Sequence, residues 1–566
     1  MKQPIGEFLL RRLQEAGIRH LFGVPGDYNL EFMQQLEERG EPAWIGNCNE
    51  LNASYAADAY ARINGIAAMI VTHGVGALSA INGIAGAYSE HVPVILISGS
   101  LPLRSVQRGD LMHHTLADRE KGNFSHMFAE VTEAQARLTP ENAVDEIDRL
   151  ILTAWRRKLP VYLELPSDIA YLEIDVPERP IQLEMLPSDQ KNLKACTDII
   201  LEKLRAAKSP ALLLDIDAIR FGVSPQIMEL ADRFHMNVAT LNCAKGAVPE
   251  SSPQFVGTYA GIASAPATRE AIEGSDCLLT VGYRRVESTT GFFSDKLPAS
   301  TIHLNSTYVD TADKNFQGVY LGELLQSIVD SSSGIITKKQ PARPPKQVAF
   351  VPSNDPLTQG EYWKAIQNFL RPGDVIVVED GTSSAGFGRL TLPDNCTYIT
   401  GAYVWCSIGY ATPALLGAIL ATPGRRHILL TGEGSLQMTV QEISTVMRHD
   451  LKPLIFVNQN QGYTVERAVL GKDASYNDIA TWRYSELPNV FCRDKKAETH
   501  VVTTGNELQV VLDSPHSTMV FVECVMDKYD APYDLVLGGH AIANTDYGSR
   551  GPQSAENAQI PMPAVR

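Results

Sequence analysis

Short apolar runs that alternate with helical patterns, repeated in three blocks, constrain the fold more than any other feature. The runs Ala67–Thr72 and Val92–Ser98 are continuous enough to be strands buried on both faces. Such strands belong to parallel sheets with helices on both sides. The sequence therefore predicts an α/β protein with three doubly wound parallel-sheet domains, whose ligands bind outside the carboxyl ends of the strands. The other expected strands are His20–Gly23, Ala211–Ile216, Asn237–Leu241, Cys277–Gly282, Val375–Glu379, His427–Thr431, Leu454–Val457 and Met519–Cys524.

Two stretches rich in proline and charge separate the blocks. Val176–Gln190 follows the first block, and Ser331–Pro356, which contains SSSG and KKQPARPPK, follows the second. The polar end of the chain, Tyr547–Arg566, is expected to be a loosely ordered tail. The predicted domains span residues 1–180, 191–335 and 357–545, and the tail spans 546–566.

Composition restricts the kind of partner. The 566 residues are 44% hydrophobic and 20% charged, with a formal net charge of −16 and no dense basic run, which argues against a nucleic-acid partner. No uninterrupted apolar stretch is long enough to span a membrane, and the first residues lack a signal-peptide core. The eight cysteines show no CxxC spacing, so neither zinc nor a disulfide framework is indicated. We therefore expect a cytoplasmic enzyme with a small-molecule substrate.

The segment Gly432–Glu466 has the residues of a phosphate and metal cradle. A Gly-Glu-Gly-Ser turn follows an apolar run and precedes a helical pattern, so backbone N–H groups can approach a phosphate at a helix start. Glu433, Asn460 and the Gly462 carbonyl offer the oxygen ligands that Mg²⁺ prefers. From these residues alone, an ordinary strand–helix–strand unit with a glycine turn remains an alternative.

Five further features stand at expected strand ends or helix starts. They are Asp27 in GVPGDYNL, Glu50, the pair His113–His114, the loop EDGTSSAGFG at 379–388, and Glu466. Each has an ordinary explanation. Asp27 suits a turn and Glu50 a helix start, and Glu466 could pair with Arg467 or a neighbour on the surface. The histidines follow an apparently irregular loop, Arg104–Met112. Such a pair could bind a metal, although no CxxC or HExxH accompanies it, and it is as often surface or structural as catalytic.

Taken in order, these motifs resemble one family. GDYN, the helix-start glutamate, HH, GTS, SIGYATPA, the cradle and GYTVE are similar to the thiamine diphosphate-dependent 2-keto acid decarboxylases. YTVERAV followed by SYNDIATW looks most like the indolepyruvate and phenylpyruvate members. The resemblance implies pyrimidine-binding, middle and diphosphate-binding domains, thiamine diphosphate and Mg²⁺ as cofactors, and non-oxidative conversion of a 2-keto acid to an aldehyde and carbon dioxide.

The resemblance also implies residue roles. Glu50 would hydrogen-bond the aminopyrimidine ring of the cofactor, Ile408 would hold the cofactor bent, and the remaining catalytic residues Asp27, His113, His114 and Glu466 would manage protons. The metal ligands would be Glu433, Asn460 and Gly462. The cofactor-binding residues would be Thr72, Thr382, Ser383, Cys406, Ile408, Gly432, Gly434, Ser435, Asn460 and Tyr463. Glu50 would come from one subunit and the cradle from another, in a homodimer or homotetramer.

Some positions depart from the family pattern. Glu433 replaces an Asp, so restoring Asp at 433 should tighten cofactor binding. Cys406 replaces a Gly, and Gln459 replaces the first Asn of a pair. Ser384, Ala385 and Val465 stand where bulkier residues are common, with the aromatic Phe387 displaced by one residue.

These smaller side chains predict a preference for aromatic or long-chain 2-keto acids over pyruvate. The other hypotheses are a pyruvate-specific decarboxylase, a carboligase of the acetolactate synthase type, and a structural or binding homologue that has lost the cofactor.

Overall fold

A computed structural model describes residues 1–118, 120, 122–333, 348–547 and 559–561. Contacts between residues divide the chain into two compact units. The first consists of residues 1–185, 410–424 and 439–451, and the second of residues 186–409, 425–438 and 452–566. Each unit is described by itself.

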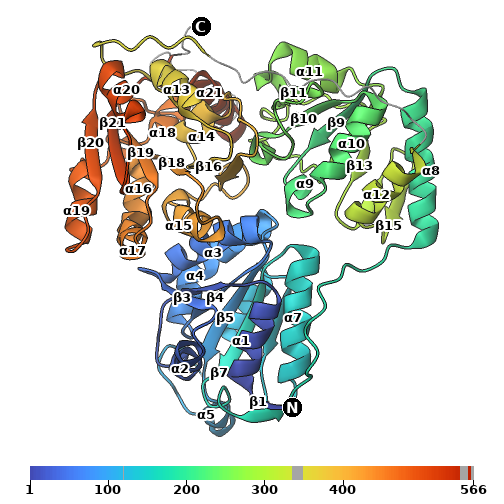
Figure 1. Cartoon of the computed structure of the whole chain (residues 1–566), viewed down its shortest axis with the longest axis vertical. Helices are drawn as coiled ribbons and strands as arrows, with labels where there is room; N and C mark the ends of the chain where they lie inside the picture. The colour runs from blue at the N-terminus through green and yellow to red at the C-terminus, as the bar shows by residue number, and fades with distance from the viewer. Residues whose placement is uncertain (119, 121, 334–347, 548–558, 562–566) are drawn as a thin grey trace. The chain divides into compact units, whose positions relative to one another are not determined.

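The sheet of the first unit has six strands in the order β3-β2-β4-β5-β7-β6, and every neighbouring pair is parallel. Helices α1 and α7 pack together on the sheet (Figure 1). The strands are β2 (His20–Gly23), β3 (Ala43–Gly46), β4 (Ala67–Val71), β5 (Val94–Ser100), β6 (Ala134–Arg137) and β7 (Val161–Pro166). The helices are α1 (Ile5–Glu15), α2 (Leu30–Arg39), α3 (Glu50–Asn64), α4 (Val75–Ser89), α5 (Leu103–Arg108), α6 (Asn123–Ala129) and α7 (Ala143–Arg157), and β1 (Lys2–Pro4) pairs with β8 (Glu173–Asp175).

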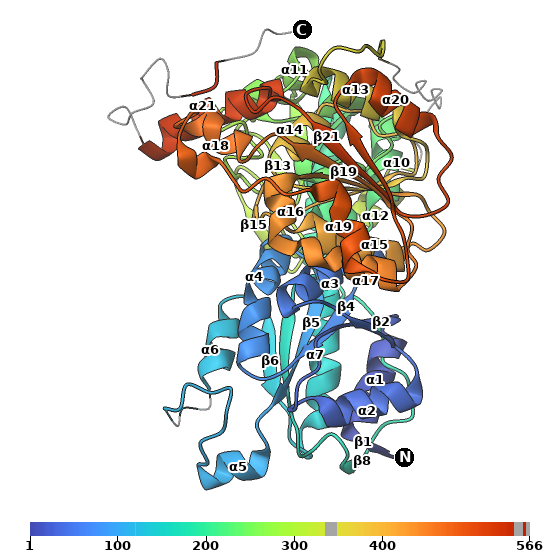
Figure 2. The same ribbon diagram turned by 90° about the vertical axis from the view of Figure 1, so that its left-hand side faces the viewer.

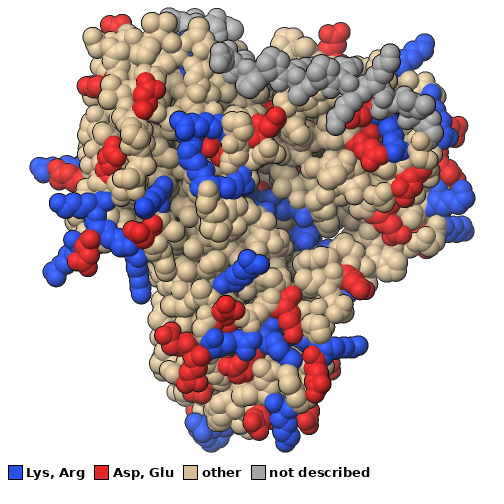
Figure 3. All heavy atoms as spheres, in the orientation of Figure 1, with Lys and Arg blue, Asp and Glu red and all other residues tan. Residues whose placement is uncertain are grey.

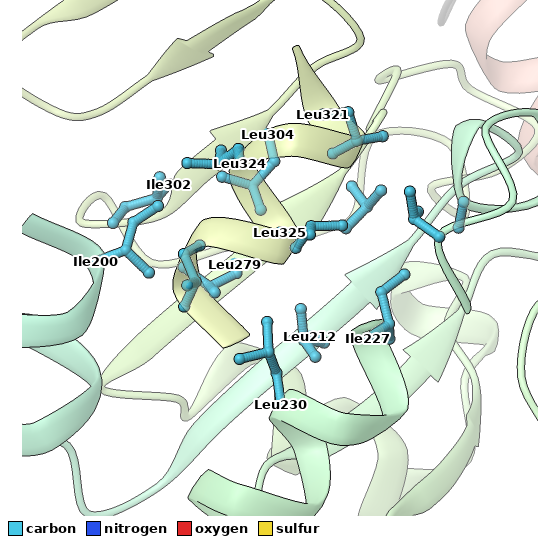
Figure 4. Packing of buried hydrophobic residues seen from close by; sticks show 14 of the residues in the cluster. Ile200, Leu212, Ile227, Leu230, Leu279, Ile302, Leu304, Leu321, Leu324 and Leu325 are labelled. Carbon is cyan, nitrogen blue, oxygen red and sulfur yellow. The ribbon is translucent and has the colours of Figure 1, made fainter. Parts of the chain in front are cut away.

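The second unit contains a seven-stranded sheet in the order β11-β10-β9-β12-β13-β14-β15. The pairs from β11 to β13 are parallel, while β14 and β15 add an antiparallel edge. Leucine and isoleucine side chains from the strands and from α8, α10 and α12 interdigitate in its core (Figure 4). The elements are α8 (Gln190–Ala206), β9 (Pro210–Leu214), α9 (Asp217–Arg220), α10 (Ser224–Phe234), β10 (Asn237–Thr240), β11 (Phe255–Thr258), α11 (Pro266–Glu273), β12 (Cys277–Val281), β13 (Ile302–Leu304), β14 (Tyr308–Asp310), β15 (Asn315–Gln317) and α12 (Leu321–Ser331).

The second sheet of this unit has six parallel strands in the order β17-β16-β18-β19-β21-β20 (Figure 2). Its central strands are buried on both faces, as the continuous apolar runs predict. The elements are α13 (Gln359–Phe369), β16 (Val375–Val378), α14 (Thr382–Phe387), β17 (Thr397–Thr400), β18 (His427–Gly432), α16 (Glu433–Thr439), β19 (Leu454–Gln459), α18 (Thr464–Val469), α19 (Leu487–Phe491), β20 (Glu498–Val502), α20 (Gly505–Asp513), β21 (Val520–Val525) and α21 (Tyr533–Tyr547).

The prediction of three doubly wound α/β domains is confirmed, with the antiparallel edge β14–β15 as an addition. The first unit also includes α15 (Ala411–Ala421) and α17 (Ile443–Arg448), which come from late in the sequence. Helix α15 packs closely on α3, because Gly417 has no side chain at the contact. A Cβ at this position would lie 1.9 Å from the carbonyl oxygen of Ala56. The domain boundaries predicted from the linkers stay a prediction.

Two local predictions were wrong. The loop Arg104–Met112, expected to be irregular, begins inside helix α5. The carboxylate of Asp168 accepts hydrogen bonds from the N–H groups of Leu103 and Arg104 at 2.7 and 3.2 Å, so a distant side chain caps this helix. The end of the chain was expected to be loosely ordered, but Ile560 is buried, with only 3% of its surface exposed. The rest of the tail and the middle of the linker Ser331–Pro356 lie outside the described residues.

Charged side chains of both signs are interspersed over the face shown in Figure 3. Within the described part of the chain, no helix combines the length and the apolar character needed to cross a bilayer.

Candidate active site

Asp27, His113 and His114 form an acid–base cluster in the first unit. Asp27 lies in the turn after β2, and its Oδ2 is 2.7 Å from Nε2 of His113. The ring of His114 lies across that of His113, with centroids 4.6 Å apart and an interplanar angle of 72°. The structure therefore brings the predicted catalytic residue Asp27 together with a histidine pair that lies far from it in the sequence.

Tyr28 supports this cluster, although the sequence analysis did not select it. Its ring stacks on His113 at 4.8 Å, and its hydroxyl lies 3.2 Å from Nδ1 of the same histidine. Burial and the neighbouring Asp27 carboxylate raise the pKa of Tyr28 to about 12, so the hydroxyl stays protonated at neutral pH. With Nδ1 directed at Tyr28, Nε2 faces Asp27.

The backbone at His114 is held in an unusual conformation. Its φ is +58°, in the left-handed region that side chains other than Gly rarely adopt. A Cβ at Gly74 would lie 2.1 Å from the carbonyl oxygen of His114, so only glycine lets the two segments approach. Strain of this kind persists where the surrounding structure fixes a functional side chain.

Glu50 is the first residue of α3, as the sequence predicts, and its carboxylate makes no hydrogen bond or ion pair within the described part of the chain. The side chain of Asn49 caps the helix by accepting from Asn52 N. The nearest approach is at Gly76, where a Cβ would lie 3.1 Å from Glu50 Oε1. Glycine at this position therefore keeps the space beside the carboxylate open.

The loop that carries Glu50 is clamped by Glu442, which is 0% exposed. Asn47 Nδ2 and Asn52 Nδ2 donate to its two oxygens at 2.8 and 2.7 Å, and Cys48 N donates at 3.2 Å. Three hydrogen bonds to one buried carboxylate fix both sides of Glu50. The sequence analysis missed Glu442, because its partners lie almost four hundred residues earlier.

Thr72 lies beside the same helix start. Its side chain is buried, and its Oγ1 has no hydrogen-bond partner among the described residues. A Cβ at Gly26 would lie 2.6 Å from Thr72 Cβ, and one at Gly76 would lie 3.2 Å from its Cγ2. A buried hydroxyl with no partner suits a position that contacts a polar ligand.

Glu433 begins α16, directly after β18, and is 1% exposed. Its Oε1 accepts hydrogen bonds from Asn460 N and Gly462 N at 3.0 and 2.9 Å. Burial raises the pKa of Glu433 to about 7, against the effect of these backbone donors. No Lys or Arg of the described chain forms an ion pair with Glu433, so its ionised form needs charge compensation from another source.

The other carboxylate oxygen points into a set of oxygens. The side-chain Oδ1 of Asn460 lies 3.3 Å from Glu433 Oε2 and 3.0 Å from the carbonyl oxygen of Gly462. Octahedral Mg²⁺ with bonds of 2.0–2.1 Å separates adjacent ligands by about 2.9 Å, which is close to both of these separations. With no cation, turning the amide would place Nδ2 against both oxygens and let Oδ1 accept from Thr464.

The rest of the cradle is closely packed. A Cβ at Gly434 would lie 2.6 Å from the Tyr463 ring, which explains the glycine in the first turn of α16. Gln459 is buried at the end of β19, and its Oε1 has no partner among the described residues. Gln459 is therefore separate from the oxygens that face the cation position, whereas Gly432 and Ser435 lie at the helix start, where phosphate binding is favoured.

The loop after β16 begins α14 with Thr382 and Ser383. Asp380, just before it, accepts from Gly381 N at 2.7 Å and from Ser384 Oγ at 3.3 Å, and burial raises its pKa. Asn458 Nδ2 donates to Ser383 Oγ at 3.3 Å, linking this loop to the end of β19.

Cys406 and Ile408 lie in the loop after β17. The φ of Cys406 is +55°, and its N–H donates to Gly401 O at 3.1 Å. A left-handed backbone explains why glycine suits this position in the family, since a Cβ there is strained.

Cys406→Gly should therefore raise the free energy of unfolding by about 0.5 kcal/mol, because relief of strain exceeds the entropy that glycine adds to the unfolded chain. Cys396 has no positive φ, so Cys396→Gly is the matched control and should lower stability. The two urea midpoints shift in opposite directions if the strain is real. A fall in both midpoints contradicts this explanation.

Glu466 lies in α18, and the ion pair with Arg467 considered for it is absent. Arg467 is fully buried and instead donates to Asp478 and to Gln461 O. Partial burial and the carboxylate of Asp380 raise the pKa of Glu466, although its side chain is exposed in the single chain. A carboxylic acid with a raised pKa can hold a proton near neutral pH.

The three predicted pocket residues take different positions. Ala385 and Val465 pack against one small apolar cluster, formed by Ala468, Ala531, Leu535, Val536 and Ile560. Ser384 is buried, and its hydroxyl donates hydrogen bonds to the loop that contains Asp380. The aromatic ring of Phe387 stacks on Tyr398 at 5.3 Å, inside the core.

Comparison with known proteins agrees with this arrangement. Family models match the descriptions "Thiamine pyrophosphate enzyme, N-terminal TPP binding domain" at residues 4–121, "central domain" at 197–320 and "C-terminal TPP binding domain" at 381–494. Pyruvate decarboxylase isozyme 1 of Saccharomyces cerevisiae is 38% identical over 561 residues, covering 96% of this chain and 99% of that protein. The chain belongs to the thiamine diphosphate-dependent 2-keto acid decarboxylase family.

The similarity to two further relatives also extends over nearly the whole of both chains. Pyruvate decarboxylase of Aspergillus terreus is 38% identical and covers 95% of this chain and 97% of its own length. Alpha-keto-acid decarboxylase of Mycolicibacterium paratuberculosis is 38% identical and covers 94% of this chain and 95% of its own length. The enzyme is thus a carboxy-lyase that uses thiamine diphosphate, which decides against the carboligase and cofactor-free hypotheses. Mg²⁺ usually accompanies this cofactor in the family.

Proposed function

We propose that this decarboxylase prefers aromatic or long-chain 2-keto acids to pyruvate. The observation that carries the proposal is the position of Ala385 and Val465. Both small side chains pack on one apolar cluster between α18 and α21, while Phe387, the nearby aromatic residue, is turned into the core by stacking on Tyr398. An apolar wall with small side chains beside Glu466 leaves room for a larger substrate.

We assign the predicted residues as follows. Glu433, Asn460 and Gly462 O hold Mg²⁺, and the start of α16 holds the diphosphate. Thiamine diphosphate, when bound, supplies a thiazolium ring that takes up electrons as carbon dioxide leaves. Glu50 would orient the aminopyrimidine of the cofactor and exchange a proton with it, and Ile408 would pack against the cofactor. Asp27, His113, His114 and Glu466 exchange protons with substrate and product.

The names of the Saccharomyces and Aspergillus relatives favour the competing hypothesis, a pyruvate decarboxylase. The test is kcat/KM for pyruvate, phenylpyruvate and indolepyruvate with the purified enzyme. We expect the aromatic substrates to have the higher values. A higher value for pyruvate would reject the preference and leave the decarboxylase assignment intact.

Ala385→Phe should lower kcat/KM for phenylpyruvate by at least about tenfold and change that for pyruvate by much less, because the added ring fills space that only the larger substrate needs. Val465→Ile adds one methylene and should also lower kcat/KM for phenylpyruvate, but by a smaller factor. Equal losses for both substrates would show that residue 385 does not line the pocket.

We also propose that two copies of the chain complete each active site, with Glu50 from one and the Glu433 cradle from the other. This assignment rests on the family resemblance. Mixing and reassembling the inactive variants Glu50→Gln and Glu433→Ala should restore about a quarter of the wild-type activity, since random pairing makes half the dimers mixed and each mixed dimer has one intact site of two. No recovery, in a mixture shown to contain mixed dimers, would place both residues in the same chain's site.

A further inference from the structure

We propose that Asp27, His113 and His114 bind a divalent transition metal such as Zn²⁺, and that this ion inhibits the enzyme. One potential ligand atom from each side chain lies within 4.8 Å of the others. The site is separate from the oxygen-lined cradle at Glu433, and the inference does not depend on which 2-keto acid is the substrate.

The donor set selects the metal. Two imidazole nitrogens and one carboxylate oxygen are the ligands of many zinc and iron sites that keep a position open for water or substrate. Mg²⁺ prefers oxygen ligands and has little affinity for imidazole. The cluster therefore suits Zn²⁺ or Co²⁺ and discriminates against the metal of the cofactor.

The distances are compatible with tetrahedral coordination. Zn²⁺ with bonds of about 2.0–2.1 Å separates its ligand atoms by about 3.3 Å. Asp27 Oδ2 and His113 Nε2 are 2.7 Å apart, and the longest separation in the cluster is at most 4.8 Å. Small side-chain rotations therefore open the first pair and close on His114, and the metal replaces the direct contact between Asp27 and His113.

The surroundings already orient the ligands. The Tyr28 hydroxyl lies 3.2 Å from Nδ1 of His113, the kind of outer contact that fixes the ring of a metal-binding histidine. The left-handed backbone of His114, fitted against Gly74, holds the second ring in place. Nδ1 of His114 is buried with no hydrogen-bond partner among the described residues.

Inhibition follows from the assigned roles. A bound metal occupies the lone pairs of His113 and His114 and the carboxylate of Asp27, so these groups no longer exchange protons. Its open position also accepts a carboxylate or water.

The test is a Co²⁺ titration of the full-length enzyme loaded with thiamine diphosphate and excess Mg²⁺. We expect one tightly bound Co²⁺ per chain with the intense visible absorption of a four-coordinate ion, which Zn²⁺ then displaces. Asp27→Asn, His113→Gln and His114→Gln should each weaken Co²⁺ binding at least about 100-fold. His126 is exposed on α6 of the same unit, so His126→Gln is the matched control and should bind as the wild type does.

Three results would overturn the proposal. One is Co²⁺ binding that persists unchanged in all three ligand variants, provided that each still binds thiamine diphosphate and is therefore folded. Another is a sulfur-to-cobalt charge-transfer band that disappears in Cys48→Ser, because Cys48 is an exposed thiol of the same unit. The third is inhibition by Zn²⁺ that is relieved by raising Mg²⁺, which would place Zn²⁺ in the Glu433 cradle.

Discussion

Replacing Glu50 by Gln is expected to lower kcat by about 10³-fold, the range typical of losing a positioned proton-transfer group. Gln keeps the shape of the side chain but cannot hold a negative charge or accept the proton. The loop on both sides is clamped by Glu442, so the variant should fold and bind thiamine diphosphate with nearly unchanged affinity. Aldehyde release at saturating substrate and a fluorescence titration of the cofactor measure the two quantities separately.

The control for this prediction is Glu31→Gln. Glu31 is an exposed acid in the first turn of α2, and Glu50 likewise lies in the first turn of α3. If Glu50 only stabilised its helix through the dipole, both variants would lose a few tenths of a kcal/mol of stability and neither would lose activity. A Glu50→Gln enzyme with wild-type turnover would therefore reject the catalytic role.

Glu433→Ala should weaken Mg²⁺ binding at least about 100-fold, or about 3 kcal/mol, and with it the binding of thiamine diphosphate. The change removes the charged ligand and leaves two buried N–H groups, of Asn460 and Gly462, without their acceptor. Calorimetry at pH 8, above the Glu433 pKa of about 7, measures the affinity with the carboxylate ionised. The control Glu486→Ala removes an exposed glutamate of the same unit and should leave the affinity unchanged.

For Glu433→Asp, the geometry favours the opposite of the result predicted from the sequence. Oε1 of Glu433 already accepts from both backbone donors, while Oε2 lies 3.3 Å from the side-chain amide of Asn460. Asp is shorter by about 1.5 Å and cannot keep both sets of contacts unless the backbone moves. We expect about tenfold weaker Mg²⁺ binding, and tighter binding would show that the cradle still suits the shorter acid.

Much of the fold was predictable from residue patterns. The expected strands agree with the observed ones to within about two residues at each end, since a buried parallel strand needs a continuous apolar run that is visible locally. The predicted start of α3 at Glu50 and the turn that ends β2 depend on helix caps and glycines, which are also local. The predicted ends of the strands also placed Asp27 and Glu433 at carboxyl ends of strands.

Other features had no local signal. Helix α5 forms because Asp168 caps it, and the loop of Glu50 is fixed by Glu442. Phe387 was expected to be displaced by one residue from the usual aromatic position, but its stacking on Tyr398 was not visible in the sequence. Each of these depends on a partner that sequence spacing does not identify.

The sequence by itself determined the three βα blocks, the family, and the residue types that we expect to handle protons and metal. Those properties come from periodicity and short motifs, whose physical causes act within a few residues. The tertiary structure alone decided that Asp27, His113 and His114 form one cluster and that the side chains of Glu433 and Asn460 meet beside the Gly462 carbonyl. Convergence of this kind depends on packing and hydrogen bonds between distant segments, because only the folded chain sets the distances between their side chains.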